Sequence, residues 1–89
     1  MECTKGFYEE LVGIENTIGE YDLDDLYWWQ ERVARIRNVV AYLGMKTKDE
    51  FEMEELCDVY EKAYEVRKKI NRQIFHLERS KQNEHDNNE

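Results

Sequence analysis

The residues that could do chemistry in this sequence are its carboxylates, two histidines and two cysteines. The acidic run at residues 22–25 resembles the start of a calcium-binding loop. Such a loop needs glycine at its sixth position and glutamate at its twelfth, where this sequence has Tyr27 and Val33. The spacing therefore predicts no calcium site.

Histidine and cysteine are too sparse to build a metal or nucleophile site. Neither His76 nor His85 follows a glutamate by three residues, the spacing of di-iron helical bundles. Cys3 and Cys57 match no zinc spacing and are too few for a disulfide scaffold. We interpret Cys57, which lies beside apolar helix positions, as a small buried hydrophobic residue.

The remaining catalytic motifs are also absent from the sequence. It contains no phosphate-binding loop, dinucleotide fingerprint or nucleophile elbow. Carboxylates are too numerous to single out one acid/base pair. We therefore expect a protein that is not an enzyme and needs no cofactor or metal; an enzyme assembled between two subunits is a minor alternative.

One set of carboxylates does have a regular spacing. Five acids recur at intervals of 4, 4, 3 and 4, which places them on one side of a helix over about 22 Å. They are Glu50, Glu54, Asp58, Glu61 and Glu65. A solvated helix face is the simpler interpretation. Carboxylates one helical turn apart also roughly match the phosphate spacing of a nucleic-acid strand, so a basic groove could accept them.

Helical periodicity predicts an all-α, three-helix domain over residues 1–79, with helices at about 5–19, 23–43 and 48–79. Thr4 is the expected N-cap of the first helix, and Gly19 and Gly44 are the expected ends of the first two. Thr47, with Glu50 three residues later, is the expected capping box of the third. Residues 80–89 are polar and predict a disordered tail.

The apolar residues of the second and third helices form one long seam at 3/4 spacing. We expect these helices to pair as an antiparallel hairpin. The third helix is longer than the second, so either the first helix packs along its far half or that half meets another subunit. A break near residues 51–53 is an alternative, and the seam could also support a homodimer.

Charge is arranged in blocks along the chain. The net charge is −8 over residues 1–31, +5 over 32–48, −7 over 49–65 and +5 over 66–81. An antiparallel hairpin sets each basic block beside an acidic one, which accounts for much of the pattern by folding alone. The acids of the first helix are left without an assigned block: Glu9, Glu10, Glu15 and Glu20. With Asp22, Asp24 and Asp25 at the start of the second helix, they are candidate partner-binding residues.

Composition narrows the class of partner. The chain has 89 residues, a net charge of −8 and 12% aromatic residues, so it is acidic but not built like a disordered acidic chain. A negative field repels nucleic acid and anionic membranes and favours basic proteins. The sequence has no secretory signal and no apolar run long enough to span a bilayer, and we expect a reduced, cytoplasmic setting.

In size, net charge and charged helical surface, the chain resembles small acidic phage-encoded host-takeover proteins of the DNA-mimic type. The resemblance covers most of the chain but rests on no motif. It implies an inhibitor that occupies the DNA-binding surface of a histone-like nucleoid protein in the host cytoplasm.

Two hypotheses follow from these patterns. In the first, the carboxylates named above bind a basic nucleic-acid-binding protein. In the second, the chain is a structural or adaptor module that oligomerises through its apolar seam. Trp29 belongs to the seam, and we expect Trp28 to pack on the first helix, although an exposed Trp28 or Tyr27 would suit a partner contact.

Overall fold

The computed structural model describes the backbone of residues 2–87 and the side chains of residues 4–81. It contains α1 (Glu2–Thr17), a 3₁₀ turn (Ile18–Glu20), α2 (Leu23–Lys46) and α3 (Glu50–Asn87), and no strand within that range. The prediction of an all-α domain with three helices is confirmed. The three helices form a rod with Cα extents of 61 × 20 × 15 Å.

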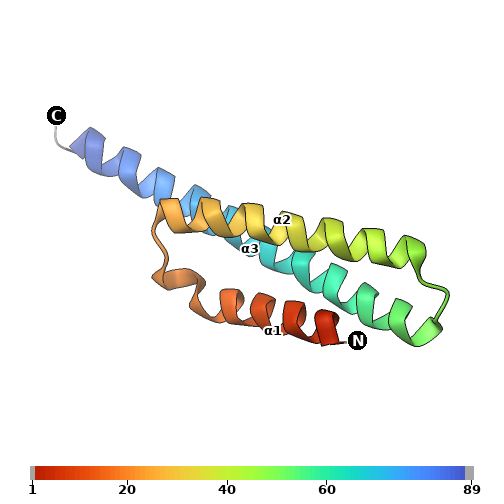
Figure 1. Ribbon diagram of the computed structural model, residues 1–89. Helices are drawn as coiled ribbons and strands as arrows, with labels where there is room; N and C mark the ends of the chain where they lie inside the picture. The colour runs from red at the N-terminus through yellow and green to blue at the C-terminus, as the bar shows by residue number, and fades with distance from the viewer. Residues whose placement is uncertain (1, 88–89) are drawn as a thin grey trace.

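α2 and α3 pack as the expected antiparallel hairpin, and α1 lies along one side of it (Figure 1). α1 runs in the same direction as α3. The hydroxyl of Thr4 meets Glu55 near one end of α1, and Glu15 meets Lys69 near the other. The alternative in which α1 packs along the far half of α3 is therefore wrong, because α1 covers the first half. The C-terminal end of α3 projects beyond α2 (Figure 1).

The core is the predicted seam, closed by residues of α1. Each helix contributes side chains that are at most 7% exposed. These are Leu11, Ile14, Leu26, Val33, Ile36, Val40, Leu56, Val59, Ala63, Val66, Ile70 and Ile74. The seam is thus filled within one chain and leaves little apolar surface for an oligomer, so an oligomer needs another surface.

An aspartate caps the start of each of α2 and α3. The side chain of Asp22 accepts a hydrogen bond from the backbone N–H of Asp25 at 2.9 Å, as expected for an N-cap. At the start of α3 the cap is Asp49, which accepts from the N–H of Phe51 at 2.8 Å. The predicted capping box at Thr47 is wrong, because the closer carboxylate takes the first-turn donors and α3 begins at Glu50.

The glycine and threonine signals also placed helix ends incorrectly. Gly44 lies inside α2, with no positive φ at any described glycine, and the N–H of Thr47 still bonds to Leu43 at 2.9 Å. Thr4 is not a cap but a buried residue within α1, only 3% exposed. α1 ends at Thr17 and tightens into the 3₁₀ turn that contains Gly19.

α3 is one continuous helix of 38 residues, so the alternative of a break near residues 51–53 does not occur. It also continues past the predicted end at Arg79 to Asn87, where we expected a disordered tail over residues 80–89. Residues 80–87 contain no proline or glycine to stop the helix. The last two residues of that predicted tail lie outside the described residues.

Candidate protein-interaction surface

The acidic stripe, defined as Glu50, Glu54, Asp58, Glu61 and Glu65, lies on the side of α3 that faces away from the core. All five residues are exposed. The only ion pair within the stripe, among the described side chains, is a 3.6 Å contact between Glu65 and Lys62 on the same helix. Since no other helix covers this side of α3, these carboxylates are available to a partner and are not needed to hold the fold together.

Two glutamates of α1 form ion pairs with the other helices. Glu10 pairs with Arg32 of α2 at 3.2 Å. Glu15 bridges Lys62 and Lys69 of α3 at 2.8 and 2.7 Å, and its side chain is only 16% exposed. The premise that all helix-one glutamates lack a complementary charge is therefore wrong for these two.

The environment of Glu15 is strongly electropositive. Hydrogen bonds from Lys62 and then from Lys69 hold the pKa of the Glu15 carboxyl below its ordinary value of 4.5, against the opposing effect of burial. The same contact raises the pKa of the Lys62 ammonium. The Glu15 bridge lies at the contact between α1 and α3 and holds the two helices together.

The other predicted acids stand apart from the stripe. Glu9 and Glu20 are exposed and make no ion pair within the part of the chain whose side chains are described. Asp22 caps α2, while Asp24 and Asp25 are exposed in its first turn, where a carboxylate stabilises the positive end of the helix dipole. The structure therefore does not bring all the predicted acids together into one surface.

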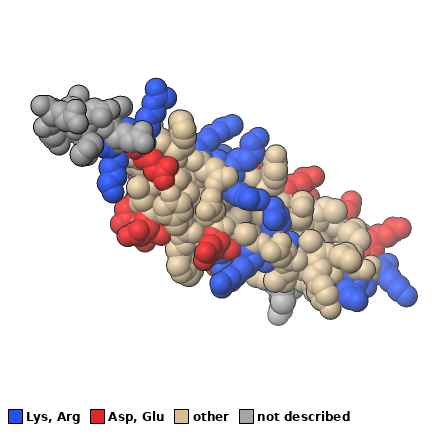
Figure 2. Space-filling model, turned by 90° about the horizontal axis from the view of Figure 1, so that it is seen from above, with Lys and Arg blue, Asp and Glu red and all other residues tan. Residues whose placement is uncertain are grey.

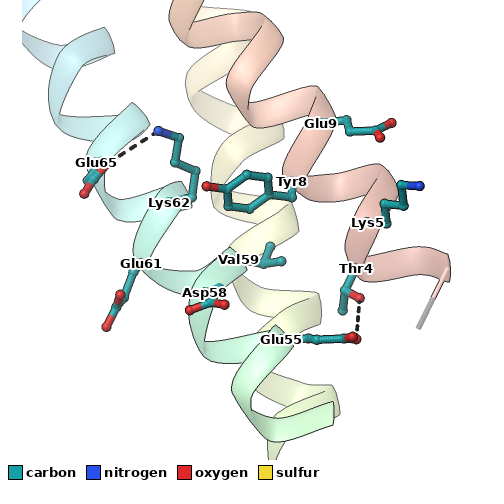
Figure 3. A pocket seen from close by; sticks show the side chains of 10 residues that line it. All are labelled: Thr4, Lys5, Tyr8, Glu9, Glu55, Asp58, Val59, Glu61, Lys62 and Glu65. Atoms are coloured by element: carbon teal, nitrogen blue, oxygen red, sulfur yellow. Dashed lines mark hydrogen bonds and ion pairs between the residues drawn. The ribbon is translucent and has the colours of Figure 1, made fainter. Parts of the chain in front are cut away.

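An open groove of about 870 Å³ separates α1 from α3 and borders the acidic stripe. Figure 3 shows Tyr8 reaching from α1 towards Lys62, with Val59 in the groove and Asp58 and Glu61 along its α3 edge. At one end the Thr4 hydroxyl donates to Glu55 at 3.2 Å. The groove thus adds a half-exposed aromatic ring beside three of the stripe carboxylates.

The outer side of α3 changes sign after Glu65. Lys68, Arg72 and Arg79 continue the same face at helical spacing, and all three are exposed. Figure 2 shows basic and acidic side chains interspersed along the side of the rod that it presents, without a continuous acidic face. The negative surface is therefore local to the first half of α3.

Sequence reasoning missed a second set of exposed residues on α3. Cys57 is exposed, contrary to our interpretation of it as buried. It lies one residue after core Leu56, which turns it about 100° away from the seam. Met53, Tyr60 and Tyr64 share this side at 39%, 43% and 54% exposure. Their spacing of 4, 3 and 4 with Cys57 is the signal that could have revealed a second stripe.

The tryptophans divide between core and surface. Trp29 packs against the core and contacts Tyr21 with ring centroids 5.8 Å apart. Trp28 is 60% exposed and makes an edge contact with Trp29 at 4.8 Å. Its ring contact is therefore within α2, whereas we expected it to pack on the first helix.

Within the described residues, no group of three or more histidine, cysteine or acidic side chains is arranged to hold a metal ion. In that same part of the chain, no helix is both long and apolar enough to cross a membrane. Comparison with protein families finds no matching model, and neither the curated proteins nor the solved structures compared with this chain show a significant match.

Proposed function

We propose that this protein is an acidic, non-enzymatic binding module that uses the acidic stripe of α3 to occupy the nucleic-acid-binding surface of a basic protein. The observation that carries the proposal is the stripe itself: five exposed carboxylates in a row on one continuous helix, facing away from the core. None of them is used to join α3 to α1 or α2 among the described contacts.

The spacing supports mimicry of a nucleic-acid strand. Five carboxylates spread over about 22 Å of helix. One DNA strand carries a phosphate every 3.4 Å along the duplex axis, or about six to seven over the same length. The stripe therefore reaches roughly three quarters of the linear charge density of one strand, enough for a basic groove to accept it in place of DNA.

The proposal is narrower than the one drawn from sequence. Glu10 and Glu15 are engaged in ion pairs between helices, so they contribute little charge to a partner. Glu9 and the groove residue Tyr8 lie on α1 beside the groove that borders the stripe. The partner surface is therefore the outer side of α3 before residue 66, with the α1–α3 groove at its edge.

The test is a competition experiment with a bacterial histone-like nucleoid protein bound to fluorescent duplex DNA. Adding the wild-type protein should release the DNA, measured as a fall in fluorescence anisotropy, and added salt should weaken this competition. The triple charge reversal Glu54→Lys, Asp58→Lys and Glu65→Lys should abolish it. Circular dichroism should show unchanged helicity.

A matched control separates the stripe from overall charge. Reversing Glu20, Asp24 and Glu31, which are exposed on the 3₁₀ turn and α2 away from the groove, changes the net charge equally. This control should retain most of the competition. Equal loss in both triple variants would show that net charge alone matters, and unchanged competition by the stripe variant would refute the proposal.

A second candidate function is that of an adaptor module, now through a surface other than the seam. Large apolar side chains favour it: Phe51, Trp28 and Tyr42 are 79%, 60% and 60% exposed. Binding of this kind would resist salt, because apolar burial is not screened. A salt-titrated pull-down therefore separates the two functions.

A further inference from the structure

The uncovered edge of α3 beside α2 has the composition of a protein interface. We call it the aromatic edge and define it as Met53, Cys57, Tyr60, Tyr64 and Phe75. Interfaces are enriched in tyrosine, phenylalanine and methionine, whereas ordinary surface is not. Phe75 is 64% exposed, so the edge continues into the second half of the helix.

Neither neighbouring helix covers this edge fully: Met53 lies beside Gly44 of α2 but is still 39% exposed. α1 contacts the opposite side of α3, through Glu55, Lys62 and Lys69. α2 approaches from the near side, where Gln30 bonds to Asn71 at 2.6 Å. At helical spacing from Gln30, α2 presents Ala34, the half-buried Arg37 and Ala41. These neighbours still leave Tyr60 and Tyr64 43% and 54% exposed.

The charges beside the aromatic edge reverse near Tyr64. The acidic stripe on the outer side of α3 ends at Glu65, one residue past Tyr64, and is followed by Lys68, Arg72 and Arg79. A surface whose sign reverses about its midpoint is complementary to a copy of itself turned end to end. In a parallel pair of the same helices, like charges would instead lie side by side.

We infer that a second copy of this chain docks on the aromatic edge, with the two α3 helices antiparallel and Tyr64 near the two-fold axis. Residues equally far before and after Tyr64 then come together. Met53 meets Phe75 of the second copy, a favourable sulfur–aromatic contact. Glu61, three residues before Tyr64, lies within one residue of Lys68 of the second copy, four residues after it, on the same flank of the pair. Each such contact occurs twice.

The size of the edge predicts a weak, reversible dimer. Tyrosine and phenylalanine side chains bury about 150–250 Å² each when fully covered. Tyr60, Tyr64 and Phe75 are roughly half exposed, so together they offer about 300 Å² per copy, less than half of the ~800 Å² per partner in a standard interface. The inference of a dimer is drawn from the exposed side chains and charges of α3 and does not depend on the proposed function.

Sedimentation equilibrium over a wide concentration series tests the pairing. The wild-type chain should show a reversible monomer–dimer equilibrium. Glu61→Lys and Lys68→Glu should each weaken the dimer at least tenfold, and the double variant should restore it, because the swap rebuilds both ion pairs. Glu61 and Lys68 are two turns apart within one chain, about 10 Å, so a rescue reports a contact between copies.

A disulfide experiment tests the register and orientation. In a Cys3→Ser background, the antiparallel pairing places Cys57 opposite residue 71 of the second copy and about 21 Å along the helix from the other Cys57. Oxidation of the Asn71→Cys variant should therefore give a dimer joined by two disulfides, each between Cys57 of one copy and the new cysteine of the other. The Cys3→Ser protein without Asn71→Cys should form no disulfide-linked dimer. The matched control Arg72→Cys, one residue away and on another side of α3, should link poorly.

Three outcomes would overturn the inference. A monomer at every concentration would show that the aromatic edge takes no second copy. Efficient linkage through Cys57 alone would indicate a parallel pair. A dimer that resists both charge reversals and Tyr64→Ser, with helicity intact, would place the interface on another surface.

Discussion

The Glu15 bridge allows a quantitative test of how α1 is held against α3. Glu15 accepts hydrogen bonds from Lys62 and Lys69, and its side chain is mostly covered. Replacing it by glutamine keeps the size of the side chain and removes the charge. Lys62, whose side chain is 17% exposed, then loses its closest counter-charge and retains only Glu65 at 3.6 Å.

The expected cost lies between that of an exposed and a buried ion pair. Exposed pairs contribute about 0.2–1 kcal/mol, and a hydrogen bond to a charged group contributes about 1.5–3 kcal/mol. Lys69 is half exposed and lies at the weak end, while the Glu15–Lys62 contact is more covered. We therefore expect Glu15→Gln to lower the free energy of unfolding by about 1.5 kcal/mol, a large share of the ~4–13 kcal/mol typical of a domain this size.

Urea denaturation followed by circular dichroism measures this cost. With an m-value of about 1.5 kcal/mol/M, the midpoint should fall by about 1 M. Glu9→Gln is the matched control on the same helix, because Glu9 is exposed, and should change the free energy of unfolding by less than about 0.5 kcal/mol.

The pH dependence gives a second readout of the same bridge. The folded-state pKa of Glu15 is held below 4.5, so its stabilising contribution is complete above the unfolded-state pKa and is lost as pH falls through the folded value. The difference in free energy of unfolding between wild type and Glu15→Gln should therefore be constant near neutral pH and shrink below about pH 4.5. A difference equal to that of the Glu9 control, or one that persists in acid, would refute a stabilising role for the Glu15 bridge.

Four further predictions follow from local contacts. Asp49→Ala should destabilise the protein by about 1 kcal/mol in urea denaturation, since Asp49 caps α3. Gly13→Ala should stabilise it by about 0.5–1 kcal/mol in the same assay, because an added Cβ meets nothing within 4 Å in mid-helix. Ile70→Ala should lower the free energy of unfolding by about 2–5 kcal/mol, because it leaves a cavity in the core, and urea denaturation should detect this loss. The bond from Tyr27 to Glu78 raises the pKa of the Tyr27 phenol above its ordinary value of 10, so ultraviolet titration should show that pKa fall in Glu78→Gln.

The helices and their pairing could be predicted because apolar spacing reports directly on burial. Leu26, Val33 and Ile36 follow the seam and are almost fully buried. Helix ends were less accessible, because Asp49 lies two residues after the predicted cap Thr47 and only geometry shows which of the two caps α3. Thr47 could have capped α3, but its hydroxyl instead accepts from Asp49 and donates to Glu52.

The candidate surface was only partly predictable for a related reason. Counting charges by block shows which helices attract each other but not which individual pairs form. Glu15 was assigned to the free surface because no basic block remained for it, yet Lys62 and Lys69 lie seven residues apart on one side of α3 and both reach it. That spacing is visible in the sequence, but it becomes informative only when α1 is known to lie beside the first half of α3.

The reversal of charge along α3 has a consequence for the range of its electric field. Near physiological ionic strength the Debye length is about 8 Å, much shorter than the 61 Å rod. A basic partner near the first half of α3 then senses carboxylates alone. At about 0.01 M salt the Debye length grows to about 30 Å, and the cationic half begins to cancel that attraction at a distance. Dilution of salt should therefore accelerate association less than it would for a uniformly anionic rod of equal length.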